Sequence, residues 1–199
     1  MSIVATDGLC RCPALSSERL SFKPLREDDV GKVVSLLSDY ETVLLLTYAP
    51  WPYTAQDALM WFNHVNRMCE MGIGCFWGIH AQDDQFIGTT GLSLFPEHKK
   101  AELHYWLGKD YWGKGYGTET AKRIIAYAFQ NCKVERLEVN HMVRNLRSQR
   151  VIEKCGFALE GIMRSYVKRF ENFEDVKFYS LLRKEFEQNM ANFRWKKNS

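Results

Sequence analysis

Three alternating glycines constrain the fold of this chain more than any other feature. They lie in the segment Tyr111-Trp-Gly-Lys-Gly-Tyr-Gly-Thr-Glu119, between a predicted strand and a predicted helix. Glycines let the backbone turn sharply at such a junction and bring several N–H groups close together. The free N–H groups and the dipole at the start of a helix then favour an anion. The segment therefore predicts a phosphate-bearing ligand, with a tight turn that binds nothing as the alternative.

The spacing of these glycines excludes two common phosphate motifs. A P-loop needs the pattern G-x-x-x-x-G-K-[ST], which the segment does not contain. The dinucleotide fingerprint G-x-G-x-x-G also fails, because Gly113, Gly115 and Gly117 are spaced by two. The phosphate ligand must therefore belong to another class.

Length and composition fit one globular domain. The chain has 199 residues, of which 46% are hydrophobic and 26% are charged, and this is enough for one sizeable core. A formal net charge of +3 is small for a dedicated nucleic-acid binder. No cysteine and histidine cluster has metal-ligand spacing, so we expect no metal. Without a signal-like start or an apolar stretch that could span a membrane, we expect a cytoplasmic protein with no membrane partner.

The order of predicted elements indicates a single mixed α/β domain. Residues 17–186 are expected to form it, after a loose leader at residues 1–16 and before a tail at residues 187–199. Apolar periodicity predicts helices at 30–37, 55–71, 117–131 and 146–154. It predicts strands at 20–25, 75–81, 86–95, 101–107, 137–143, 157–167 and 173–182.

Four motifs in order and spacing resemble the GNAT superfamily of acetyl-CoA-dependent N-acetyltransferases. The glycine segment resembles the acetyl-CoA loop [Q/R]-x-x-G-x-[G/A], with Trp112 at the first position. That tryptophan departs from the general pattern but is usual in the Rim-type branch, whose members acetylate ribosomal-protein N-termini. Residues 145–157 match the branch's N-x-x-S-x-x-x-x-E-K-x-G-F at every fixed position. Residues 17–25 and 101–107 resemble its "TERLxLRPL" opening and its "AEIGYWL" strand.

The resemblance implies the GNAT fold, of α/β (α+β) class. Its mixed central sheet would have about seven strands, splayed between residues 101–107 and 137–143, with flanking helices. Acetyl-CoA would bind in the splay, with its pyrophosphate on the glycine segment. The residues implied to hold it are Tyr105, Trp106, Leu107, Trp112, Gly113, Lys114, Gly115, Tyr116, Gly117, Thr118 and Asn145. The arginines at 144, 147 and 150 are candidates for the 3′-phosphate, or for a solvated helix face.

The implied reaction is direct attack of a neutral amine on the thioester. Many superfamily members protonate the leaving thiolate with a tyrosine, but the aligned residue here is Ile152. In the Rim-type branch the proposed acid is the serine that corresponds to Ser148, whose alternative is a helix-surface serine. Glu102 on the splayed strand is the candidate base. His104 lies on the same face and is a second candidate, water is a third, and the two side chains could instead form a hydrogen-bonded pair.

The acceptor should meet the variable elements of the domain. Trp51, Tyr53 and Tyr166 are expected to contact it, although the first two could equally pack their own loop onto the domain. A protein N-terminal α-amine, such as that of a ribosomal protein, is the leading expectation, because its pKa of about 8 leaves part of it neutral at pH 7. A small-amine acetyltransferase and a non-catalytic acyl-CoA-binding domain are the alternatives. The sequence leaves the acceptor open, as it does the choice between a monomer and a homodimer.

Overall fold

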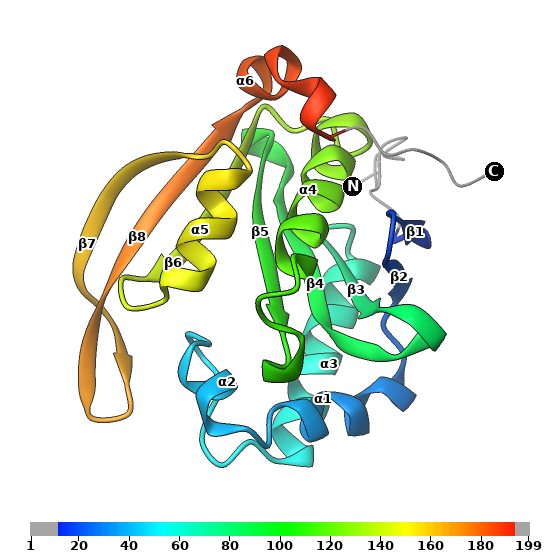
Figure 1. Ribbon diagram of the computed structural model, residues 1–199, viewed down its shortest axis with the longest axis vertical. Helices are drawn as coiled ribbons and strands as arrows, with labels where there is room; N and C mark the ends of the chain where they lie inside the picture. The colour runs from blue at the N-terminus through cyan, green and yellow to red at the C-terminus, as the bar shows by residue number, and fades with distance from the viewer. Residues whose placement is uncertain (1–11, 194–199) are drawn as a thin grey trace, which may run out of the picture.

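One mixed sheet of eight strands organises the chain (Figure 1). The structure, a computed structural model, describes residues 12–193. The strand order is β1-β2-β3-β4-β5-β6-β8-β7. The strands are β1 (Leu15–Ser16), β2 (Ser21–Pro24), β3 (Gly74–His80), β4 (Phe86–Phe95), β5 (Lys100–Leu107), β6 (Arg136–Met142), β7 (Ala158–Arg169) and β8 (Asn172–Leu182).

Six α-helices accompany this sheet in residues 12–193: α1 (Val30–Leu36), α2 (Tyr40–Leu44), α3 (Ala55–Glu70), α4 (Tyr116–Gln130), α5 (Leu146–Lys154) and α6 (Arg183–Gln188). Thr54 caps α3 as predicted, since its hydroxyl accepts a hydrogen bond from Asp57 N and its own N–H donates to Asp57 Oδ2. The short helix α2 was not predicted. Asp39 caps it by accepting from Thr42 N at 2.9 Å.

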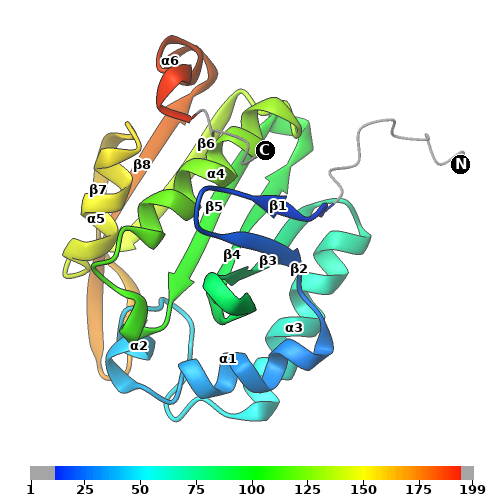
Figure 2. The ribbon, with the colours of Figure 1, turned by 45° about the vertical axis from the view of Figure 1, so that its right-hand side comes forward.

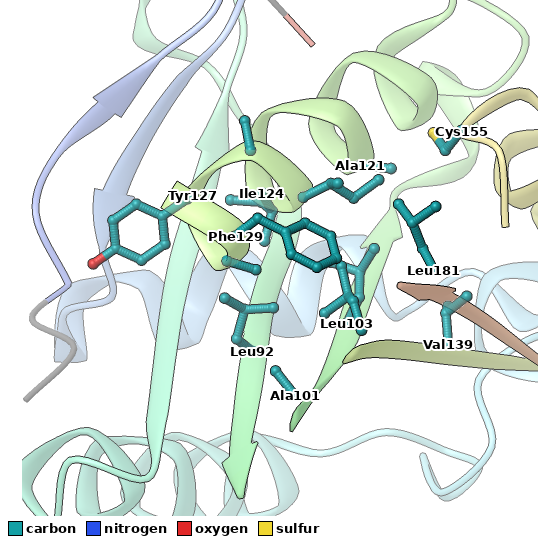
Figure 3. Packing of buried hydrophobic residues seen from close by; sticks show 14 of the residues in the cluster. Leu92, Ala101, Leu103, Ala121, Ile124, Tyr127, Phe129, Val139, Cys155 and Leu181 are labelled. Atoms are coloured by element: carbon teal, nitrogen blue, oxygen red, sulfur yellow. The ribbon is translucent and has the colours of Figure 1, made fainter. Parts of the chain in front are cut away.

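The helices cover both faces of the sheet (Figure 2). Leu103 and the apolar face of α4, including Ile124 and Phe129, belong to one buried cluster (Figure 3). Residues of α1 and α3 pack with Phe86 and Trp106 in a second cluster. Because neighbouring strand residues point to opposite faces, Leu103 and Trp106 in the same strand assign the two clusters to opposite sides.

The sheet opens between β5 and β6. These two parallel strands pair only at their first three positions, where Lys100, Ala101 and Glu102 face residues 136–138. The antiparallel ladder of β4 with β5 continues over eight residue pairs to Leu107. The far half of β5 therefore keeps one neighbour and has lost the other, and its backbone groups face the opening.

The expected GNAT fold and its central splay are confirmed. The sheet has eight strands instead of about seven, because Leu15 and Ser16 pair with β2. Both residues fall in the segment expected to be a leader, whose residues 1–11 lie outside the described chain. At the other end the expected tail includes Phe193, which is buried with its ring 5.1 Å from that of Phe186. Residues 194–199 lie outside the described chain.

Candidate active site

A cavity of about 370 Å³ lies where the sheet opens. The end of β5, the glycine segment and α5 line it, together with residues of α2. Most of the residues predicted to hold acetyl-CoA line it: Tyr105, Trp106, Leu107, Trp112, Gly113, Gly115, Gly117, Thr118 and Asn145. A larger hollow of about 820 Å³ lies near Phe129 and Phe186 and includes none of the predicted site residues.

Two predicted cofactor residues, Lys114 and Tyr116, are not part of the cavity lining. The Lys114 ammonium lies 5.6 Å from the centre of the Tyr111 ring. The Tyr116 ring is covered by the guanidinium of Arg19 at 4.7 Å. In this structure these two side chains therefore contact neighbouring side chains of the protein, and Tyr116 also packs against the buried core.

The glycine segment forms the turn that its sequence predicted. Gly113 and Gly115 have φ angles of 74° and 83°, in the left-handed region that side chains other than glycine rarely adopt. Gly115 is the N-cap of α4, so the first amides of this 15-residue helix point out of its end. Trp112 Nε1–H donates to Leu107 O at 2.8 Å and holds the turn against the end of β5. Backbone amides at a helix start, next to a cavity, suit a pyrophosphate.

Three cations of α5 line the same cavity: Arg147, Arg150 and Lys154. The Arg147 guanidinium also lies 5.1 Å from the centre of the Trp112 ring. Arg144 does not line it, because its side chain donates to Leu44 O and pairs with Glu174 at 3.0 Å. Arg147 and Arg150 thus remain candidates for a phosphate, whereas Arg144 holds neighbouring elements together.

A carboxylate at the C-terminal end of the glycine segment anchors it to the chain before β2. Glu119, in the first turn of α4, is only 8% exposed. Its Oε1 accepts from Arg19 N and from the Ser17 hydroxyl, both at 2.7 Å. Its Oε2 accepts from Arg19 Nε at 2.8 Å and pairs with Nη2 at 2.7 Å. Arg19 also donates to Lys114 O at 3.0 Å, so the chain before β2 is tied directly to the glycine turn.

Ser148 lies inside the cavity, as the motif predicted. Asn145 caps α5 and accepts from Ser148 N at 3.1 Å, which fixes the first turn of the helix. The Ser148 hydroxyl is 2.8 Å from the Tyr105 hydroxyl, which reaches it from β5. Burial raises the pKa of Tyr105 against a smaller opposing effect of the Ser148 hydrogen bond, so the phenol keeps its proton. Ile152, one turn further on, is buried in the core.

Glu102 and His104 point to one face of β5 but make separate contacts. Glu102 accepts from Asn140 Nδ2, on β6, at 2.7 Å. His104 Nε2 is 2.8 Å from the Ser93 hydroxyl on β4, and its ring stacks on Phe76 at 6.1 Å. Burial lowers the pKa of His104, while the nearby Glu102 charge opposes the shift. The imidazole is therefore neutral at pH 7, and the carboxylate is held by an amide.

The predicted acceptor residues separate into two groups. Tyr166 on β7 is 53% exposed, and its ring packs edge-on against Phe178 with the ring centres 5.2 Å apart. Tyr48 is 83% exposed, and its pKa is raised first by partial burial and then by Tyr166 and Glu102. Trp51 instead packs against Tyr40 at 5.0 Å. Tyr53 packs in the cluster of α1 and α3, where burial raises its pKa to about 12.

Arg169 connects the β7–β8 hairpin to the loop around Trp51. This side chain is 5% exposed and donates to Ala49 O at 2.6 Å and to Val43 O at 2.9 Å. Next to it, Phe170 stacks on Tyr40 at 5.9 Å. Burial lowers the pKa of Arg169, with a further contribution from Arg144. The hairpin and the α2 segment thus form one wall beside the cavity, held by a buried cation.

Sequence reasoning missed four contributors: Asn140, Ser93, Tyr48 and Arg169. The first two hold Glu102 and His104 from neighbouring strands. Only the aromatic loop at residues 47–53 carried a signal, and it pointed to Trp51 and Tyr53 as strongly as to Tyr48.

Neither a metal centre nor a membrane helix is found in residues 12–193. Within this range no group of three or more His, Cys, Asp or Glu residues is placed to hold a metal ion. None of the helices described there is long and apolar enough to cross a membrane.

Comparison with known proteins identifies the domain. A family profile described as "Acetyltransferase (GNAT) domain" matches residues 19–158. The chain is 40% identical over 180 residues to "Probable N-acetyltransferase YjcK" of Bacillus subtilis, which covers 87% of this chain and 99% of that protein.

Two further comparisons concern Rim-type proteins. The "Ribosomal-protein-serine acetyltransferase" of Escherichia coli is 27% identical over 100 residues, covering 50% of this chain and 56% of that protein. The structure titled "Mycobacterium smegmatis RimJ in complex with CoA-disulfide" superposes with a TM-score of 0.81, at 15% identity, over 93% of this chain and 98% of that chain. At that identity the superposition supports the fold alone.

Proposed function

Because the chain belongs to the GNAT acetyltransferases and is an acetyl-CoA-dependent enzyme, we propose that it acetylates the N-terminal α-amine of a protein. Within that class we propose a ribosomal protein as the acceptor, and the cytoplasm as the compartment. The observation that supports this choice most is Ser148. It stands in the cavity with its hydroxyl engaged, while the position where many family members carry a tyrosine is a buried isoleucine.

The residues of the cavity fit the parts of acetyl-CoA. The amides that follow Gly115 would take the pyrophosphate, and Arg147 and Arg150 would lie near the 3′-phosphate. The unpaired half of β5 offers backbone N–H groups to the pantetheine arm and to the carbonyl of the thioester.

The described residues offer a candidate group for each catalytic need, of which Ser148 lines the cavity, whereas Glu102 and His104 are not part of its lining. Unpaired N–H groups of β5 would stabilise the oxyanion that develops when the amine attacks. Glu102, directly or through water, would accept the proton of the incoming ammonium, and neutral His104 is the second candidate base. Ser148 would donate its proton to the sulfur as the C–S bond breaks.

The exposed tyrosines favour a cationic acceptor of modest charge. Tyr48 is 83% exposed and Tyr166 is 53% exposed, and aromatic faces attract ammonium groups. The neighbouring wall is held by a buried arginine instead of an acidic cluster, which suits one terminal ammonium better than a polyamine. The Rim-type motif and the partial likeness to a ribosomal-protein acetyltransferase point in the same direction.

The test is CoA release with acetyl-CoA and a panel of acceptors. The panel contains peptides with a free N-terminus, the same peptides blocked at that end but carrying lysine, spermidine and free amino acids. Mass spectrometry of the product locates the acetyl group. Turnover of the free-N-terminus peptides alone supports the proposal, and turnover of spermidine or amino acids alone replaces it with small-amine acetylation. A protein that binds acetyl-CoA and turns over no amine would refute catalysis at this site.

A further inference from the structure

The hydroxyl of Tyr105 makes its one close polar contact in residues 12–193 with Ser148. Tyr105 comes from the half of β5 that has lost its β6 partner, and both residues line the cavity. Its oxygen lies 2.8 Å from Ser148 Oγ and 3.5 Å from Ser148 O. The two residues are 43 positions apart in the chain, so the fold alone brings them together.

We propose that Tyr105 is a positioning residue for the leaving-group proton: its phenol donates to Ser148 Oγ and leaves the serine hydrogen free to point at the departing sulfur. The proposal rests on the function proposed above, in which Ser148 is the acid. It assigns to the Tyr105 side chain a role beyond lining the cofactor cavity.

The direction of this hydrogen bond follows from the partners available. Tyr105 is partly buried against the cluster around α4, and a tyrosine hydroxyl in such a position usually finds an acceptor for its hydrogen. Within residues 12–193 the acceptors in reach are Ser148 Oγ at 2.8 Å and Ser148 O at 3.5 Å. If the serine were the donor, the phenol hydrogen would keep only the longer contact. Donation by Tyr105 therefore gives the phenol hydrogen its shorter hydrogen bond.

Without Tyr105, the Ser148 hydroxyl could donate its hydrogen to a carbonyl of its own helix. A serine inside a helix commonly donates its hydrogen to the carbonyl one turn earlier, and that bond would remove the proton from the cavity. In the described chain the Ser148 hydroxyl instead lies against Tyr105, across the cavity from its own helix. A phenol that donates to Ser148 Oγ favours the rotamer that faces β5, in which the serine hydrogen is directed away from the helix backbone.

The proton inventory of the step is complete with water. The C–S bond breaks and its electron pair goes to sulfur, which takes the proton of Ser148 Oγ. Ser148 takes the proton of Tyr105, and the phenol regains one from water at the open cavity. The hydroxide that this leaves is neutralised by the proton that the base took from the amine. A thiol has a pKa of about 8.5 and a phenol of about 10, whereas an aliphatic hydroxyl is a far weaker acid. A serine therefore needs a second group to replace its proton as it leaves.

The experiment is a double-mutant cycle with the full chain. The variants are Tyr105→Phe, Ser148→Ala and both together, with Tyr179→Phe as control, because Tyr179 is a buried tyrosine whose hydroxyl contacts His141 outside the cavity. We expect Tyr105→Phe to lower kcat about 10-fold and Ser148→Ala about 100-fold, within the range of general acid catalysis. The KM for acetyl-CoA should change less than about twofold. The double variant should be no slower than Ser148→Ala, because both changes act on one proton.

Three results would overturn the proposal. They are an unchanged kcat in Tyr105→Phe, an equal fall in Tyr179→Phe, and a double variant slowed by the product of the two single effects. Circular dichroism and thermal melting check that each variant is folded. If no amine is turned over, the function proposed above fails, and the cycle is then run on the hydrolysis of acetyl-CoA to acetate and CoA, which needs the same leaving-group proton. An additive cycle there refutes the role of Tyr105 independently of the acceptor.

Discussion

Removal of the Glu119 carboxylate should loosen the glycine turn and lower the stability of the whole domain. The side chain is almost fully buried, and one of its oxygens accepts from Arg19 N and the Ser17 hydroxyl, both at 2.7 Å. The other oxygen pairs with the Arg19 guanidinium, whose side chain is 43% exposed. The change to test is Glu119→Ala, with Glu119→Gln as the conservative comparison.

The two oxygens of the Glu119 carboxylate contribute unequally to the free energy of unfolding. A hydrogen bond to a charged group contributes about 1.5–3 kcal/mol, and two such bonds lie on the buried oxygen. The half-exposed guanidinium pair counts for at most about 1 kcal/mol after solvent screening. Because the three contacts share one group and are not additive, we expect Glu119→Ala to lower the free energy of unfolding by about 3 kcal/mol. Glutamine keeps an acceptor for the two short bonds, so its loss should be about 1 kcal/mol.

Urea denaturation followed by tryptophan fluorescence gives these differences directly. For a domain of this size, about 3 kcal/mol corresponds to a fall in Tm of roughly 6–12 °C. A loss below about 1 kcal/mol in Glu119→Ala would refute the importance of this network. If Glu119→Gln lowered the free energy of unfolding as much as Glu119→Ala, the charge of Glu119 would contribute more to stability than its two short hydrogen bonds.

The Glu119 network also bears on the affinity for CoA, where removal of the negative charge of Glu119 should help instead of harm. Glu119 is a negative charge in the first turn of the helix that would receive the pyrophosphate, and Arg19 is its counter-ion. Arg19→Met should therefore raise the Kd for CoA several-fold, because the carboxylate without its counter-ion repels the pyrophosphate, and about 1 kcal/mol of repulsion is roughly a fivefold change in Kd. Adding Glu119→Gln to Arg19→Met should restore most of the affinity, measured by isothermal titration calorimetry. An equally weak double variant would mean that Arg19 contacts the ligand instead of neutralising Glu119.

Three further predictions follow from the site and its walls. Gly115→Ala forces a side chain into a left-handed φ of 83° and should raise the Kd for CoA at least tenfold in the same calorimetry, with a fall in unfolding free energy of about 1 kcal/mol. Arg169→Met removes both carbonyl contacts of the hairpin and should raise the KM of the acceptor several-fold while leaving the KM for acetyl-CoA unchanged in steady-state assays. Burial lowers the pKa of both His104 and His141, so the unfolded chain binds more protons than the folded chain below about pH 6.5. Urea titrations should therefore show that the free energy of unfolding falls as the pH is lowered through this range, by up to about 1.4 kcal/mol per pH unit per histidine.

The elements that the sequence predicted are those whose signal is local. The glycine turn could be read because left-handed φ angles and a helix start leave a mark within nine residues. Helix α3 could be placed because its capping pair, Thr54 and Asp57, is three residues apart. The short helix α2 was missed because five residues are too few for an apolar period to show. At the glycine turn, the resemblance to the acetyl-CoA loop and the physical argument from glycine conformation predicted the same local structure.

The side-chain pairs that complete the site depend on strand register, which no local pattern encodes. Glu102 meets Asn140 because β5 and β6 pair in parallel just before they separate, so two residues 38 positions apart come within 2.7 Å. Ser93 stands directly across from Glu102 in the ladder of β4 and β5, yet its hydroxyl lies against His104 two residues further along. A shift of one residue in either ladder would move all of these groups to the other face. The candidate base could therefore be named from the sequence, whereas the groups that set its orientation required the fold.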